Sequence, residues 1–386
     1  MSASPFHPGE LEAQALAGGG AAGGGIRDFM VEQHRTFFEA LPFVVVATVD
    51  GGWPVAALLT GKPGFVSVSD RHTLRIATED PAQRAFVTGA PAGVLGIDLA
   101  TRRRNRANGT IASTEPGVLV LDVRQSFGNC PRYIHVRDVR PTARAPDPAE
   151  PLPRLDADAR MAISSADTLF VASAARTVEL NGGVDVSHRG GPRGFVRVED
   201  RTLTIPDYSG NRYFNTLGNL VSNPRAALLF VDFEQGDLLH LQGTTEIVWG
   251  GPELRSFPAA ERLWRFRVDR AWRNRSALPL RWTPRASAAE SDLSASDPPA
   301  PGQWTEEQGS RRSAGHRPED RRGAPGEDHA EDPGWVRRVA RPLRHPQRAG
   351  GSLRVVAGSC GHSLRGLSTP RYGPRRPPAA CLSGAR

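Results

Sequence analysis

The 386-residue chain is 39% hydrophobic and 23% charged, which supports one large core or two smaller ones and excludes a wholly disordered chain. Its formal net charge is +8 at pH 7, but basic residues outnumber acidic ones by only 33 to 30 up to Ala289, and by 16 to 11 beyond it. A nearly neutral body lacks the dense basic face of a nucleic-acid-binding protein, so we expect no nucleic-acid partner.

Cysteine and hydropathy patterns exclude further classes. Cys130, Cys360 and Cys381 are too scattered for an iron–sulfur cluster or a cysteine zinc site, and an odd number does not suit a disulfide framework. The histidines show no ligand spacing, so we predict no metal site. Neither a secretory signal nor a run of roughly 18 apolar residues is present. We therefore expect a cytoplasmic protein with no membrane partner.

The N-terminal part predicts a leader, a linker, a helix and then strands. Residues 1–25 form a leader that ends in the low-complexity sequence AGGGAAGGG, which is typical of a mobile linker. From Ile26 to Leu41 apolar residues recur every three or four positions, as in an amphipathic helix that ends before Pro42. Runs rich in β-branched residues at 43–49, 55–59 and 64–68 then predict a meander of short strands.

This strand pattern occurs twice. The sequence GFVSVSDRHTLRI, which begins at Gly64, is echoed by GFVRVEDRTLTI, which begins at Gly194. Asp98 precedes Gly109 by eleven residues, as Asp232 precedes Gly243. A repeat longer than the roughly 20–50 residues of a solenoid unit indicates a duplicated domain. We expect domains at residues 26–143 and 144–285, joined by the proline-rich stretch at 141–153.

The C-terminal part predicts an end to the ordered structure. Alternating residues within 263–282 favour a last strand, and we expect order to stop near Pro284. Residues 286–386 are rich in Arg, Pro and Gly with few large apolar residues, so we predict a disordered tail. Its abrupt start and lack of periodicity also suggest the hypothesis that it is an out-of-frame translation of GC-rich DNA.

At the level of motifs the chain resembles a known family. The second copy contains SGNRYFNTLGNLVSNP from Ser209 and ALLFVDF from Ala227, and these resemble the pyridoxamine 5′-phosphate oxidase-like, FMN-binding split-barrel family. In the first copy, QSFGNCPRYI from Gln125 and FHPGE from Phe6 are similar to a large, tandem subgroup of that family. The resemblance covers residues 6–282. It implies a mainly β fold with peripheral helices, in which two tandem split barrels pack as an internal pseudo-dimer.

The resemblance also implies FMN bound between the two barrels. The phosphate-side candidates in the second copy lie before the Gly190-Gly191 turn and around the start of the next helix; they are Ser187, His188, Arg189, Arg212, Asn215 and Asn219. Guanidinium groups and hydroxyls suit a phosphate dianion. The opposite wall is expected from the first copy, where Arg102, Arg104 and Arg106 share one face of a strand.

The two copies differ at these positions. The first copy has Thr60-Gly-Lys-Pro where the second is interpreted to have Ser187-His-Arg-Gly, and the strand from Asp237 to Gly243 lacks the arginines. We therefore predict one complete flavin site per chain. Structural alternatives remain open: the arginines as a solvated strand edge, Ser187 to Arg189 as a surface hairpin, and the asparagines as helix caps.

No acid–base catalyst stands out, so the catalytic residues are unknown. The resemblance implies an FMN-dependent oxidoreductase in which the flavin transfers hydride or electrons, with a small-molecule substrate or an electron donor such as a reduced nicotinamide. The alternatives are a non-catalytic flavin- or haem-binding carrier or sensor, and a deazaflavin-dependent reductase. We expect a monomer with an internal pseudo-dimer, or a homodimer.

Overall fold

The computed structural model describes residues 4–80, 84–115, 117–143, 145–176 and 183–285. Strands dominate over helices in the described residues, so the predicted mainly β fold class is confirmed. No helix in these ranges is long and apolar enough to cross a membrane. The predicted disordered tail and the reading-frame hypothesis concern residues 286–386, which lie outside the described residues.

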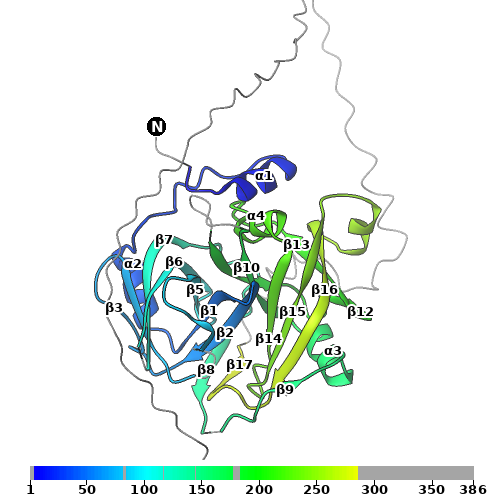
Figure 1. The fold of residues 1–386 in the computed structure, drawn as a ribbon. Coiled ribbons are helices and arrows are strands. Elements are labelled where there is room, and N and C mark those ends of the chain that lie inside the picture. The colour runs from blue at the N-terminus through cyan, green and yellow to red at the C-terminus, as the bar shows by residue number, and fades with distance from the viewer. Residues whose placement is uncertain (1–3, 81–83, 116, 144, 177–182, 286–386) are drawn as a thin grey trace, which may run out of the picture. The chain divides into compact units, whose positions relative to one another are not determined.

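The first copy forms a seven-stranded antiparallel sheet with the order β2-β1-β5-β6-β7-β4-β3 (Figure 1). Its strands are β1 (Phe43–Asp50), β2 (Trp53–Thr60), β3 (Val66–Val68), β4 (Thr73–Ala77), β5 (Pro91–Asp98), β6 (Arg103–Glu115) and β7 (Val118–Gly128). Branched and aromatic side chains that suit a pleated, buried surface fill β1, where six consecutive residues are buried.

The second copy repeats this strand order as β11-β10-β14-β15-β16-β13-β12, and a short strand β9 joins it at β16. Its strands are β9 (Glu150–Pro151), β10 (Thr168–Ala174), β11 (Val184–Gly190), β12 (Arg197–Glu199), β13 (Thr202–Tyr208), β14 (Arg225–Val231), β15 (Leu238–Val248) and β16 (Ala260–Asn274). Each strand of the first sheet thus has a counterpart at the same place in the second, as a duplication requires.

Backbone hydrogen bonds fix the correspondence residue by residue. The amide of Gly61 donates to Pro42, and the amide of Gly191 donates to Asp167 at the same point of the second copy. Counting back from these glycines, Ala57 corresponds to Ser187 and Leu59 to Arg189. The interpretation that Thr60-Gly-Lys-Pro stands in for Ser187-His-Arg-Gly is therefore wrong, because it is displaced by three residues from the register that the turns impose.

The two copies pack together through a shared core. Each sheet encloses its own apolar cluster, and a third cluster takes residues from both copies. Within the third cluster the indole of Trp282 meets Phe43 of the first copy and Phe233 of the second, each with ring centroids 5.3 Å apart. A separate two-stranded sheet of β8 (Arg137–Pro141) and β17 (Leu280–Pro284) also joins them. The copies therefore form an internal pseudo-dimer.

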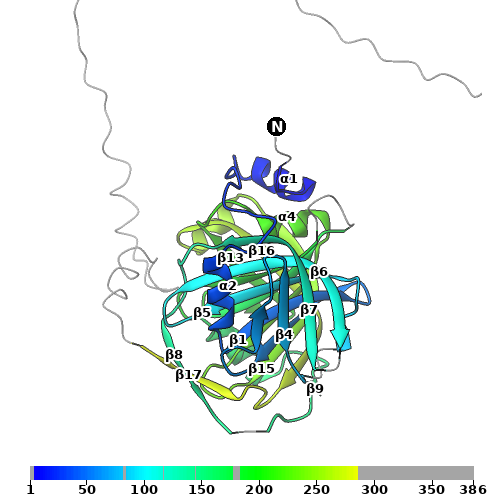
Figure 2. The ribbon, with the colours of Figure 1, turned by 90° about the vertical axis from the view of Figure 1, so that its left-hand side faces the viewer.

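The helices lie at the periphery of the sheets: α1 (Pro8–Leu16), α2 (Glu32–Glu39), α3 (Ala157–Ser164) and α4 (Asn215–Ser222). Figure 2 shows α2 against the first sheet. The predicted helix from Ile26 to Leu41 is shorter than expected. Arg27 and Ser126 exchange backbone hydrogen bonds of 3.0 and 2.7 Å, so the chain before α2 is bridged to β7 at Arg27 instead of coiling into a helix.

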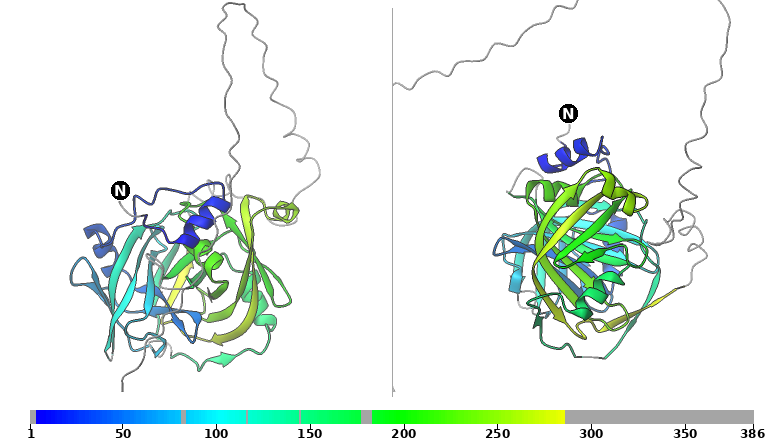
Figure 3. Two further views of the ribbon diagram at one scale, coloured as in Figure 1. Left: turned by 45° about the horizontal axis from the view of Figure 1, so that its top comes forward. Right: turned by 90° about the vertical axis from the view of Figure 1, so that its right-hand side faces the viewer.

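The sequence analysis does not predict helix α1, which lies directly over α4 (Figure 3). It begins where Pro8 stands at its first position and Glu10 closes a capping box with His7. The glycine-rich stretch that follows is irregular, as expected, but it is held in place: Arg212 donates from its Nη2 to the carbonyls of Ala17 and Gly19. The expected mobile linker is therefore anchored to the second copy.

Candidate functional site

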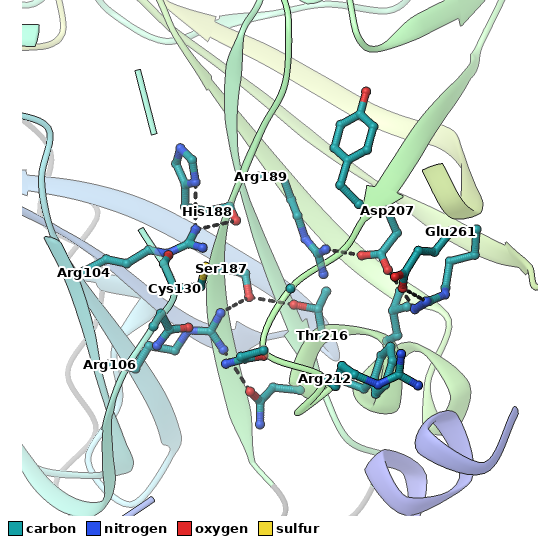
Figure 4. Close-up of a pocket in the computed structure, with 18 residues that line it drawn as sticks. Arg104, Arg106, Cys130, Ser187, His188, Arg189, Asp207, Arg212, Thr216 and Glu261 are labelled. Carbon is teal, nitrogen blue, oxygen red and sulfur yellow. Dashed lines mark hydrogen bonds and ion pairs between the residues drawn. The ribbon is translucent and has the colours of Figure 1, made fainter. Parts of the chain in front are cut away.

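A pocket lies where the two copies meet, with about 610 Å³ of atom-free space, part of it open to solvent. Its walls come from β6 and the segment after β7 in the first copy, and from β11, β13, α4 and β16 in the second (Figure 4). The lining residues are Arg104, Arg106, Asn129, Cys130, Ser187, His188, Arg189, Asp207, Tyr208, Gly210, Asn211, Arg212, Phe214, Asn215, Thr216, Leu217, Glu261 and Arg262.

Arg106 of β6 reaches across into the second copy. Its side chain is only 8% exposed, and its Nη1 donates to Asp185 at 2.9 Å and to the amide oxygen of Asn215 at 3.2 Å. Its Nη2 donates to the hydroxyl of Ser187 at 2.6 Å. Burial lowers the pKa of Arg106, and the neighbouring carboxylate of Asp185 acts against that shift. The guanidinium is thus a fixed cation whose Nη atoms are occupied.

Arg104 lies two residues earlier on the same face of β6. Its Nε donates to the carbonyl of Cys130 at 2.8 Å, and its Nη1 lies 2.9 Å from Nδ1 of His188. Burial lowers the pKa of Arg104 to about 9 and holds that of His188 well below its usual range. His188 is therefore neutral. Because its Nδ1 accepts from Arg104, its proton is on Nε2.

Two further arginines share one carboxylate on the other side of the pocket. Arg189 of β11 pairs with Asp207 through its Nη1, and Arg262 of β16 pairs with the same carboxylate at 3.2 Å. Arg262 also pairs with its neighbour Glu261. The five arginines that line the pocket outnumber its two carboxylates, so the pocket favours an anionic ligand.

Left-handed backbone positions place the start of α4 against β11. Arg212 and Phe214 have φ angles of 58° and 62°, which turn the chain sharply before Asn215. The turn brings Thr216 to the pocket, where its hydroxyl lies 2.6 Å from that of Ser187. The first amides of α4 therefore face the same region as Ser187.

The sequence of the second copy matches a known protein family. Residues 155–280, which span most of the second copy, match the family model of pyridoxamine 5′-phosphate oxidase. The second copy is therefore similar to the pyridoxamine 5′-phosphate oxidase family. The predicted resemblance is thereby confirmed, and the first copy extends the family barrel into a tandem pair.

Several solved structures are similar to this chain over about a third of its length. HupZ of Group A Streptococcus is 18% identical, covering 29% of this chain and 87% of its own, with a TM-score of 0.23. An FAD-binding protein of Mesorhizobium loti is 12% identical, covering 33% and 97%, with a TM-score of 0.22. The FAD and haem binding protein of Mycobacterium smegmatis is 19% identical, covering 27% and 72%, with a TM-score of 0.20. A search of the curated proteins finds no match.

Of the nine predicted cofactor-binding residues, the structure brings seven together around the pocket: Arg104, Arg106, Ser187, His188, Arg189, Arg212 and Asn215. The guanidinium of Arg212, however, donates to the leader carbonyls of Ala17 and Gly19. The role of these seven residues in cofactor binding stays a prediction.

The other two predicted residues lie outside the pocket. Asn219 is one turn further along α4, where its amide donates to Ser173 at 3.1 Å in the interior. Arg102 belongs to the turn before β6, with φ of 55°, so it does not continue the alternation that places Arg104 and Arg106 on one face.

The sequence analysis did not identify several residues that lie at or next to the pocket. Asp185 could have been identified from the sequence, because it lies two positions before Ser187 and a strand places such residues on the same face. Asp207 and Arg262 had no such signal: they come from β13 and β16, and only the sheet pairing of Asp207 with Arg262 brings them to the pocket. Among the described residues, no group of three or more His, Cys, Asp or Glu side chains could hold a metal ion.

Proposed function

We propose that the pocket binds FMN and that the protein is an FMN-dependent oxidoreductase. One observation carries the proposal. Arg106 Nε, His188 Nε2 and Arg189 Nε are buried donors of pocket-lining side chains, and none has a hydrogen-bond partner within the described residues. A buried donor without a partner costs about 1–3 kcal/mol, so three at one pocket argue for a ligand rich in acceptors. FMN, with its phosphate and carbonyl oxygens, is such a ligand.

Different residues of the pocket suit different parts of FMN. Arg189 and the first amides of α4 suit the phosphate, because they combine a guanidinium with backbone donors, and Ser187 holds Arg106 beside them. Arg104, Arg106 and the neutral His188 present donors to the oxygens and nitrogens of the ring. When bound, FMN supplies hydride or electron transfer, so the protein has only to orient the substrate and exclude water. Because the flavin itself would carry this chemistry, the proposal is consistent with the lack of an obvious acid–base catalyst in the sequence.

The pseudo-symmetric location lacks these groups. Ala57 and Leu59 stand where the second copy has Ser187 and Arg189, and sheet register places His240 at the position of Arg106. The His240 ring stacks on Trp272 at 4.9 Å, and burial lowers its pKa to about 4, so it is neutral. Gln242 donates to the carbonyl of Pro54 at 3.0 Å and ties the two copies together there. We therefore infer one flavin per chain.

Deazaflavin is the second candidate, because its phosphate-bearing tail would use the same donors. Haem is less compatible with the pocket. A histidine that ligates iron needs a free lone pair, and His188 carries its proton on Nε2 while Nδ1 accepts from Arg104.

The test is an absorbance titration of the full chain with FMN, riboflavin and deazaflavin in turn. We expect FMN to bind with a shifted flavin spectrum. Ser187→Ala, which removes a buried hydroxyl of the pocket, weakens binding by about tenfold. The matched control is Ser164→Ala on the exposed end of α3, which leaves binding unchanged.

The same titration decides between the candidates. Failure of FMN to bind would contradict the proposal, and exclusive binding of deazaflavin would replace the cofactor. Addition of reduced nicotinamides to the loaded protein then tests turnover. A bound flavin that no donor reduces would favour a carrier or sensor.

A further inference from the structure

The leader places a buried carboxylate behind the pocket. At the start of α1, Nδ1 of His7 accepts from the amide of Gly9 at 3.1 Å, and Oε2 of Glu10 accepts from the amide of His7 at 2.9 Å. Residues His7 and Glu10 are only 2% and 4% exposed, although α1 lies at the periphery of the fold. An acidic side chain is seldom buried without a specific partner.

Two glycines let α1 approach α4 closely enough for this burial. A Cβ on Gly9 would lie 2.4 Å from the carbonyl oxygen of Gly218, and a Cβ on Gly218 would lie 2.5 Å from Cα of Glu10. The two backbones are therefore in direct contact, with no room for a side chain between them. This contact is consistent with the burial of the Glu10 side chain.

The partner of Glu10 is the amide of Asn215, at the start of α4. Oε1 of Glu10 accepts from Nδ2 of Asn215, and the amide oxygen of Asn215 accepts from Nη1 of Arg106 at 3.2 Å. An amide can present either its oxygen or its nitrogen to a neighbour. Both carboxyl oxygens of Glu10 accept hydrogen bonds here, from His7 and from Asn215, so Glu10 selects the orientation in which the oxygen of Asn215 meets the guanidinium.

We propose that Glu10 is a positioning residue of the site, which acts through the amide of Asn215 to hold Arg106 with its Nε free for a ligand. The proposal rests on the function proposed above. Without Glu10, the amide of Asn215 can rotate and set its NH₂ group against the guanidinium. Two donors would then face each other, and Arg106 would leave the orientation that the pocket requires.

The test compares Glu10→Met with Glu10→Gln in FMN titrations of the full chain. Methionine has a similar volume and no strong acceptor, whereas glutamine keeps an oxygen for Asn215. We expect Glu10→Met to weaken FMN binding about tenfold and Glu10→Gln to stay within about threefold of wild type. Glu12→Gln, on the exposed side of the same helix, is the control and leaves binding unchanged.

A double-mutant cycle separates positioning from general destabilisation. If Glu10 acts through Asn215, then Glu10→Met combined with Asn215→Ala binds FMN no more than about threefold more weakly than Asn215→Ala alone. Independent effects, with the two losses multiplying, would overturn the proposal. So would wild-type affinity in Glu10→Met. Absence of FMN binding by the wild-type chain would instead contradict the proposed function, so the two failures are distinguishable.

Discussion

At the scale of single residues, Arg106 is where the two copies depend on each other most. It belongs to the first copy, yet its four described hydrogen bonds all go to residues of the second. Asp185, its ionic partner, has a side chain only 4% exposed. A buried pair of this kind is costly to break from one side, because the charge that stays behind is neither solvated nor paired.

Arg106→Leu should therefore lower the free energy of unfolding by about 3–5 kcal/mol. The double variant Arg106→Leu with Asp185→Leu removes both charges and should recover much of that loss. Urea unfolding of the three proteins without ligand measures both quantities. A double variant as unstable as the sum of the two single variants would show that the pair is not coupled.

Glu10 should make stability depend on pH. Burial raises its pKa from 4.5 to about 7, while the charges of Asp185 and Arg106 that face it act in opposite directions. The folded protein thus keeps a proton that the unfolded chain releases above pH 4.5. The stabilisation from Glu10 is complete below that pH and is lost as the pH rises through 7.

Glu10→Gln removes this titration. Relative to wild type, the free energy of unfolding of Glu10→Gln should increase by about 3 kcal/mol between pH 4.5 and pH 8. Urea unfolding at both pH values measures it. Parallel stability profiles of the two proteins would mean that Glu10 is ionised at all of these pH values in the folded state.

At the scale of elements, the contact between α1 and α4 depends on the absence of a side chain at Gly218. A methyl group there would lie 2.5 Å from backbone of α1, so Gly218→Ala should cost about 1–3 kcal/mol or detach the leader. Limited proteolysis within residues 17–25 measures detachment. Gly250→Ala is the control, since nothing lies within 4 Å of its added methyl group. Equal resistance of the two variants would contradict the account.

The elements that the sequence predicted well are those with a local signal. β1 was predictable from Phe43 to Val49 because branched and aromatic residues dominate this stretch, and six consecutive residues of the strand are buried. The start of α2 was not, because the apolar residues of 26–31 follow a helical spacing, whereas the backbone there bonds to distant residues, Arg27 to Ser126 of β7 and Met30 to Arg71. In the site, Arg104 and Arg106 followed from strand alternation. Arg102 did not, since a left-handed turn precedes β6.

At the scale of the whole molecule, duplication and divergence have separate consequences. The copies share a strand order and an apolar cluster, and each contributes residues to the pocket. Their polar residues are unequal. The pocket keeps Arg106, Ser187 and Arg189, whereas its counterpart has His240, Ala57 and Leu59.

The measurement that tests this account most directly is calorimetric titration of the full chain with FMN, repeated on Ser187→Ala and on Ala57→Ser. We predict one FMN per chain, weaker binding in Ser187→Ala, and no change in Ala57→Ser, which alters the corresponding position of the other copy. Two flavins per chain, no binding, or a loss of affinity in Ala57→Ser that matches the loss in Ser187→Ala would contradict the account.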